Sequence, residues 1–112
     1  MKRYGWVVRL RAGKADEYRR LHAAVWPDVL ATITACGIRN YTIFLRRLDD
    51  GRDHLFAYFE HHGRDLAEDL RKMAADPATQ RWWKLTEPLQ DPLDSRAQGE
   101  WWATMEEVFH QD

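Results

Sequence analysis

Three side chains with complementary chemistry recur at intervals of four residues near the N-terminus: Tyr18, His22 and Trp26. At about 100° per residue, a helix would place them within an arc of roughly 80° on one face. A phenol, an imidazole that titrates near neutrality and an indole with one N–H donor would then share one space. This trio suits a polar, uncharged, ring-shaped ligand. The same spacing is also typical of an amphipathic helix that simply buries its aromatic residues.

Three further aromatic residues are candidates for the same site. Tyr41 falls early in an expected strand, where it either faces a cavity or packs as a cross-strand core aromatic. Trp82 and Trp83 would lie about 100° apart on a helix, so one could serve the core and the other a pocket or interface. Sugar recognition gives such a pair a use, because the C–H face of a pyranose packs on aromatic rings; core filling is the alternative.

Other kinds of catalytic site find little support in the motifs. The five histidines lack the spacing of metal ligands, and neither a phosphate-binding glycine-rich loop nor a nucleophile elbow is present. Cys36 has no charged neighbour that would activate its thiol. We therefore expect neither a metal nor a cofactor.

The composition is that of a globular protein. With 112 residues, of which 45% are apolar and 31% charged, the chain is expected to form one domain spanning 1–112. A net charge of −1 argues against a nucleic-acid partner, and no apolar run approaches a membrane span. One cysteine excludes an internal disulfide, so a reducing cytoplasm is the expected compartment. Six tryptophans hint at an aromatic-lined cavity or interface.

Periodicity and turn residues predict an alternation of strands and helices. In strand 38–45, Tyr41 and Ile43 would share one face and Ile38 would lie on the other. Proline should interrupt the first helical stretch at Pro27. In order, the expected elements are strand 4–10, helix 14–36, strand 38–45, a turn at 49–52, strand 54–59, a helix from 63 to about 76, a short helix 80–85, a surface loop 90–99 and strand 102–109.

This order is that of an α+β, ferredoxin-like βαββαβ sandwich. Helices would cover one face of its sheet and leave the other bare. The bare face must be buried by a partner or filled by a ligand. We therefore expect a homodimer joined through the sheets.

Four segments spread over almost the whole chain resemble the L-rhamnose mutarotase family. The most specific are the His-x-x-x-Trp-Pro and Gln-Arg-Trp-Trp-Lys pieces. The segments are 17–28, 40–45, 80–84 and 105–109. The resemblance implies a dimeric α/β barrel, with His22 as the proton donor and with Tyr18, Tyr41, Trp82 and Trp83 as sugar-binding positions. The chain departs from the family pattern around 61–73 and 90–102.

The resulting hypothesis is a mutarotase that interconverts the α and β anomers of L-rhamnose or a related 6-deoxy sugar by general acid–base catalysis. His22 would be the principal acid, and Tyr18 or Tyr41 would hold or relay the second proton. The tryptophans, Trp26 included, would pack against the apolar face of the sugar. The alternatives are an L-fucose mutarotase, a dimeric haem-binding or cofactor-free oxygenase, and a non-catalytic sugar-binding protein.

Overall fold

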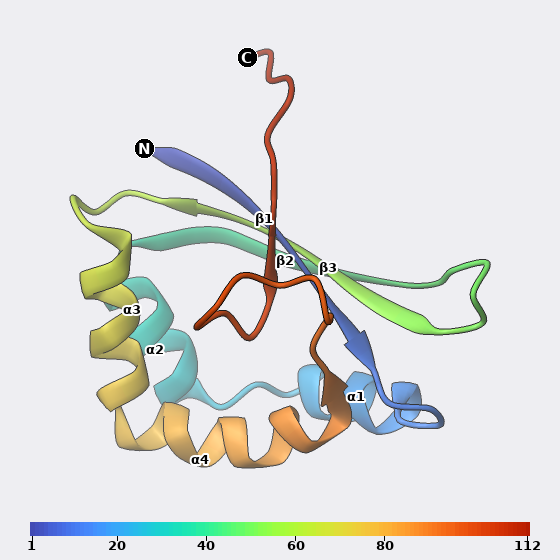
Figure 1. Cartoon of the computed structure of the whole chain (residues 1–112). Helices are drawn as coiled ribbons and strands as arrows, with labels where there is room; N and C mark the ends of the chain where they lie inside the picture. The colour runs from blue at the N-terminus through green and yellow to red at the C-terminus, as the bar shows by residue number, and fades with distance from the viewer.

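The computed structural model describes residues 1–112 as an antiparallel sheet with all its helices on one side (Figure 1). The sheet has the order β2-β3-β1-β4, and β5 also pairs with β1. This is the strand order of a βαββαβ unit, as the sequence predicted. The elements are β1 (Lys2–Leu10), α1 (Ala15–His22), α2 (Pro27–Ala35), β2 (Ile38–Arg47), β3 (Asp53–His61), α3 (Leu66–Ala75), α4 (Pro77–Thr86), the 3-10 turn η1 (Glu87–Leu89), β4 (Gln90–Asp91) and β5 (Ala103–Met105).

The first helical stretch is broken near Pro27, as predicted. α1 ends at His22, and α2 starts afresh with Pro27 as its first residue. Trp26 is the extended N-cap residue of α2, with φ −62° and ψ 135°. A proline favours this extended conformation in the residue before it. The helical spacing that placed Trp26 on the face of Tyr18 and His22 therefore does not apply.

A β-bulge changes which residues of β2 face the helices. Arg39 pairs with Glu60, but the next paired residue, Thr42, faces Tyr58, so β2 carries one extra residue. Asn40 absorbs it with a φ of 52°, a left-handed conformation that asparagine tolerates well. Ile38 consequently lies on the same face as Tyr41. The prediction that they face opposite sides was wrong, because strict alternation does not anticipate a bulge.

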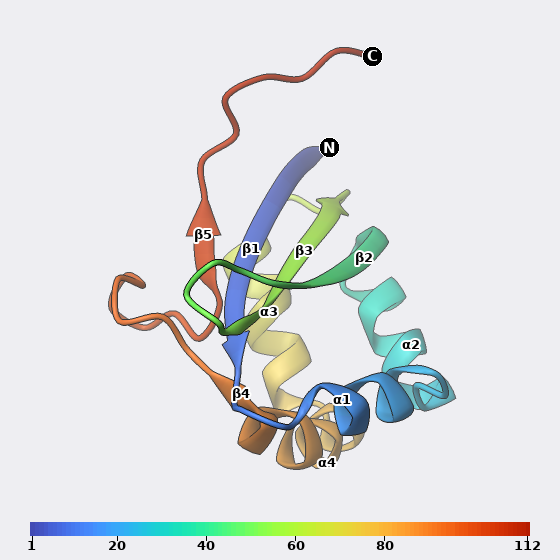
Figure 2. The same cartoon turned by 90° about the vertical axis from the view of Figure 1, so that its right-hand side faces the viewer.

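The last edge of the sheet is split into two short strands. β4 pairs with Arg9 and Leu10, and β5 pairs with the first half of β1, opposite Gly5 (Figure 2). Residues 92–102 leave the sheet between them. The predicted loop therefore begins after Asp91, where Pro92 offers no N–H to a ladder. The predicted strand 102–109 is shorter than expected, because residues 106–112 run away from the sheet (Figure 1).

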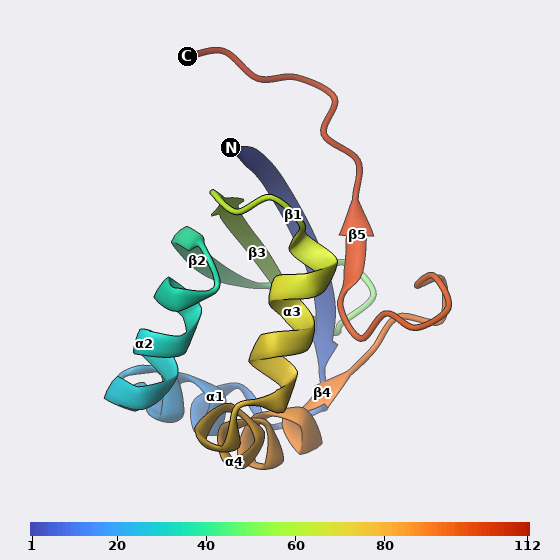
Figure 3. The ribbon, with the colours of Figure 1, turned by 90° about the vertical axis from the view of Figure 1, so that its left-hand side faces the viewer.

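The core lies between the sheet and the helices. Val8, Leu10 and Leu55 are fully buried against α1 at one end of the sheet, and Phe59 packs with Met73 of α3 at the other. α2 and α3 lie under the sheet, and α4 crosses below them (Figure 3). None of these helices has the length and apolarity needed to cross a membrane. The opposite face of the sheet carries no helix.

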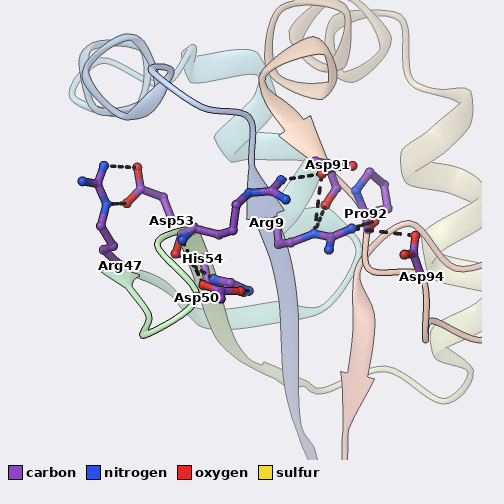
Figure 4. Close-up of polar contacts among 9 residues, drawn as sticks. Arg9, Arg47, Asp50, Asp53, His54, Asp91, Pro92 and Asp94 are labelled. Atoms are coloured by element: carbon purple, nitrogen blue, oxygen red, sulfur yellow. Dashed lines mark hydrogen bonds and ion pairs between the residues drawn. The ribbon is translucent and has the colours of Figure 1, made fainter.

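A polar network anchors β4 to the rest of the sheet (Figure 4). Arg9 donates from Nε to the Asp91 carbonyl at 3.3 Å and from a terminal nitrogen to the Pro92 carbonyl at 2.9 Å. Arg52, beyond the β2–β3 turn, donates to the Asp91 carboxylate at 2.6 Å. These contacts join β1, the β2–β3 hairpin and β4, and so fix where Gln90 enters the core.

Candidate active site

A cavity of about 940 Å³ lies between the sheet and the helices. Most of its lining is apolar, with contributions from all four helices. The polar and titratable residues on its walls are Tyr4, Tyr18, His22, Thr34, Asn40, Tyr41, Thr79, Thr86, Glu87, Gln90, Glu100 and Thr104. A cavity with apolar walls and a few polar groups suits a small ligand that has both polar and apolar faces.

His22 presents one nitrogen for chemistry. Its Nδ1 lies 3.0 Å from the main-chain carbonyl oxygen of Tyr18. A carbonyl only accepts, so Nδ1 carries the proton and Nε2 holds the lone pair in the neutral ring. Burial lowers the pKa of His22, and the hydrogen bond to the Tyr18 carbonyl partly opposes this shift. At neutral pH the imidazole is therefore uncharged, with Nε2 ready to accept a proton.

Two aromatic rings hold the imidazole. The Tyr18 ring stacks on it at a centroid distance of 4.0 Å, and the two planes are inclined by only 18°. The Trp82 ring meets it edge-on at 5.3 Å. Stacking fixes the ring plane while the Nδ1 hydrogen bond fixes the rotation, so the direction of Nε2 is set before any ligand arrives.

The phenols of Tyr4, Tyr18 and Tyr41 line the cavity, and the sequence had offered Tyr18 and Tyr41 as site candidates. Tyr18 is only 4% exposed, and burial together with the neighbouring Tyr41 raises its pKa, while a hydrogen bond from the Gln90 side chain opposes the rise. Tyr41 also lines the cavity, and desolvation of its hydroxyl raises its pKa to about 12. The phenols of Tyr18 and Tyr41 are therefore protonated at neutral pH and can donate hydrogen bonds to a ligand.

The tryptophan pair of α4 also lines the cavity. Asp76 caps this helix by accepting from the Thr79 main-chain N–H at 2.9 Å, and Pro77 follows as the first helical residue. Trp82 is almost buried, whereas Trp83 is partly exposed. Helix geometry had left open that one of the two serves the core, but both line the cavity, where the family resemblance places them as sugar-binding positions.

Trp26 is not part of the cavity wall. Its ring packs edge-on against Trp82 at 5.2 Å, and it joins the cluster formed by Val29 and Ala78. The prediction that Trp26 contacts the ligand is therefore corrected: the break in the helix turns it away from the site. Trp26 therefore packs against Trp82 and does not line the cavity.

Gln90, Trp101 and Trp102 belong to the site although sequence reasoning did not assign them to it. All three line the cavity. The Trp101 indole N–H donates to Gln90 Oε1 at 2.7 Å, and the Trp102 ring lies against Trp6. For the two tryptophans, the only signal in the sequence was the high tryptophan content. No sequence signal indicated Gln90, because it lies in a two-residue strand, which is too short to show periodicity.

Acidic residues are few in the cavity and do not gather into a metal site. Burial raises the pKa of Glu87, whereas hydrogen bonds from Thr104 and the Ala97 main chain lower that of Glu100. Nowhere in the chain do three or more His, Cys, Asp or Glu residues lie close enough together to hold a metal ion. The groups on the cavity wall that can transfer protons are therefore the imidazole, the phenols and these two separate carboxyl groups.

Comparison with known proteins agrees with this chemistry. The family model for L-rhamnose mutarotase matches residues 3–111. The chain belongs to the L-rhamnose mutarotase family. An L-rhamnose mutarotase of Oceanobacillus iheyensis is 34% identical over 114 residues, which cover 100% of both chains. One of Burkholderia orbicola is 39% identical over 74% of both chains, and one of Bacillus subtilis is 37% identical over 80% of both.

Solved structures confirm the ferredoxin-like fold of this family member. An L-rhamnose mutarotase from Formosa agariphila superposes with a TM-score of 0.75 at 21% identity, and all of both chains are covered. Tetracenomycin F2 cyclase, a polyketide cyclase from Streptomyces glaucescens, gives a TM-score of 0.68 at 18% identity with the same coverage. At these identities the likeness establishes the fold alone, since one fold serves several chemistries.

Proposed function

We propose that this chain is a mutarotase that interconverts the α and β anomers of L-rhamnose. The observation that carries the proposal is the orientation of His22, whose Nδ1 is held by the Tyr18 carbonyl while the ring borders the cavity. Two protonated phenols, Tyr18 and Tyr41, border the same space. The curated relatives named as L-rhamnose mutarotases support this function over the oxygenase and binding-protein alternatives.

The reaction needs one proton acceptor and one donor. Opening the ring removes the proton from the anomeric hydroxyl and delivers a proton to the ring oxygen, and the bond between C1 and the ring oxygen breaks. Neutral His22 takes the first proton at Nε2, while Tyr18 or Tyr41 donates toward the ring oxygen. After rotation about the C1–C2 bond, the ring hydroxyl attacks the other face of the aldehyde carbon; the tyrosinate takes back the proton of that hydroxyl, and the imidazolium returns its proton to the aldehyde oxygen.

This account refines the role expected from the sequence. The sequence hypothesis made His22 the principal acid. The depressed pKa and the Nδ1 hydrogen bond favour a base during ring opening. The same residue is then the acid during ring closure, so both descriptions concern one proton that leaves and returns.

The aromatic wall suits a 6-deoxy sugar. The indole faces of Trp82 and Trp83 offer surfaces for the C–H groups of a pyranose and for its methyl group. One buried methyl contributes about 0.8 kcal/mol to binding, so the wall favours a deoxy sugar over one with a hydroxyl at that carbon. L-Fucose shares the methyl group and is the competing substrate.

Saturation-transfer proton NMR tests this function. One anomeric proton of L-rhamnose is irradiated and the loss of intensity is followed at the other, with and without protein. We expect transfer that depends on protein concentration and is faster with L-rhamnose than with L-fucose. Faster exchange of L-fucose would reassign the substrate, and equal spectra with and without protein would reject a mutarotase.

We also propose a homodimer joined through the bare face of the sheet. Phe44 on this face is 63% exposed, and the register places Phe56, Val7 and Tyr58 beside it. An exposed apolar patch of this kind is typical of a protein–protein interface. The dimer expected from the sequence would bury it.

A cytoplasmic location completes the proposal. Cys36 is the single cysteine, and it is a buried free thiol. Thiols persist in a reducing compartment, which supports the cytoplasm over an oxidising space.

A further inference from the structure

Gln90 is held in one orientation by a tryptophan outside the family motifs noted in the sequence. Gln90 is 4% exposed, and its Oε1 accepts the Trp101 indole N–H at 2.7 Å. Its main chain is fixed by the pairing with Leu10 of β1 and by the polar network at the neighbouring Asp91. Backbone and side chain are therefore both positioned before a ligand binds.

The loop that carries Trp101 is held in shape by hydrogen bonds of its own. The Glu100 carboxylate accepts from the Thr104 hydroxyl at 2.5 Å and from the Ala97 main-chain N–H at 3.0 Å. These bonds join both sides of the turn that precedes Trp101. The indole N–H is thus a fixed donor, aimed at Gln90.

This donor decides which end of the Gln90 amide faces the cavity. An indole N–H can only donate, so the atom that it meets must be the amide oxygen. The amide nitrogen, Nε2, is then the group left toward Tyr18 and the cavity. No side-chain nitrogen or oxygen that is fully enclosed in the protein lacks a partner, so Gln90 Nε2 is either hydrogen-bonded within the protein or open to the cavity that Gln90 lines.

We propose that Gln90 is a substrate-binding residue, which donates from Nε2 to an oxygen of the sugar beside His22 and is kept in that orientation by Trp101. A second consequence concerns Tyr18. Because the Tyr18 oxygen accepts from Gln90, its own O–H is free to donate to the ligand. The inference rests on the proposed mutarotase function and adds two residues to its binding site.

Gln90→Glu is the direct test, because the carboxylate keeps the acceptor for Trp101 and loses the donors. KM and kcat for L-rhamnose are taken from the exchange rate at increasing sugar concentration. Above about pH 7.5 we expect KM to rise by about tenfold or more, with a smaller change in kcat. At about pH 5 the introduced carboxyl gains a proton and can donate again, so KM should move back toward the parent value.

Gln98→Glu is the matched control. It introduces the same charge at an exposed position in the loop that follows β4. Its KM should stay within about twofold of the parent at both pH values. A merely structural role of Gln90 would lower the melting temperature without a pH-dependent KM, and that pattern would overturn the assignment.

Trp101→Phe removes the orienting bond and keeps an aromatic ring, although the pyrrole half of an indole that is 39% exposed is lost with the N–H. We expect a rise in KM of roughly threefold, since the amide is then free to turn. An active parent whose KM is unchanged by both Gln90→Glu and Trp101→Phe would overturn this inference alone. A parent that neither binds nor exchanges L-rhamnose would overturn the proposed function as well.

Discussion

The two faces of the sheet differ in what their side chains do. On the helix-covered face, alternate residues of β1 and β3 such as Trp6 and Phe59 form one wall of the cavity. Val7 of β1 and Phe56 of β3 pair with each other and lie on the bare face, where their neighbour Phe44 of β2 is mostly exposed. The same strands therefore serve a binding site on one side and, in our proposal, an assembly surface on the other.

The candidate groups for proton transfer to a ligand lie on only one of these two faces. The groups that can exchange protons with a ligand, His22, Tyr18 and Tyr41, lie with the covered face, where burial shifts their pKa values. The bare face carries Val7, Phe56 and Phe44 in one row, with charged residues such as Arg3 and Glu60 farther along the strands. A substitution on one face should therefore impair one property and spare the other.

Replacing His22 should give the largest effect on activity. His22→Asn removes the titrating nitrogen, so the exchange rate should fall by roughly 10²–10⁴-fold, while the mass in solution is unchanged. Saturation-transfer NMR measures the rate, and His62→Asn, at an exposed position, is the control. A rate within about threefold of the parent would remove His22 from the mechanism.

Replacing Phe44 should separate assembly from activity. Phe44→Lys places a charge in the proposed interface, and the particle mass measured by light scattering should fall to that of one chain, 13.3 kDa. Leu85→Lys is the control, because Leu85 is also exposed but lies on α4, away from the bare face. Exchange should persist in the Phe44 variant, since one chain supplies every proposed site residue. A dimer that survives would place the interface elsewhere.

The pH dependence of exchange should show a moderate effect of defined sign. The pKa of His22 lies below its ordinary value, and the neutral ring is the base. The enzymatic rate, corrected for the His22→Asn background, should therefore rise with pH, level off by about pH 7 and stay level to about pH 8. A rate that falls over this range would identify the imidazolium as the initial acid.

The smallest effect should come from the edge of the sheet. Asp91→Asn weakens the ion pair with Arg52, and the carboxylate is partly exposed, so the free energy of unfolding should fall by no more than about 1 kcal/mol. Urea unfolding measures this change, and both the exchange rate and the dimer should be retained. Hydrogen bonding from Arg52 and the charge of Arg9 lower the pKa of Asp91, so the stabilising contribution is present above its unfolded pKa and is lost as acid protonates it. Exchange is expected to persist because Arg9 still donates to the Asp91 and Pro92 carbonyls and holds Gln90 in place; a loss of exchange would show that the Arg52 ion pair is also needed.

Much of the fold could be predicted from local patterns. Pro27 marked the helix break, and the change between periods of two and about 3.6 marked the strands and helices. The bulge at Asn40 and the split edge strand could not be predicted in this way, because each depends on pairing with another strand. Strict alternation along β2 therefore assigned Ile38 to the wrong face of the sheet.

The site was predictable where its chemistry is local. Tyr18 and His22 lie four residues apart on one helix, and their placement in one cavity agrees with the spacing. Trp26 shares that spacing, but the helix ends before reaching it. Gln90 and Trp101 come together through a hydrogen bond between segments of the split edge, so only the three-dimensional structure brings them to the site.

The most direct test of the account is the exchange rate of the L-rhamnose anomers, measured by saturation transfer in the same buffer with the parent protein, with His22→Asn and without protein. We predict fast transfer with the parent and transfer close to the protein-free rate with the variant. Equal rates in all three samples, from a protein shown to be folded, would contradict a catalytic site on the covered face.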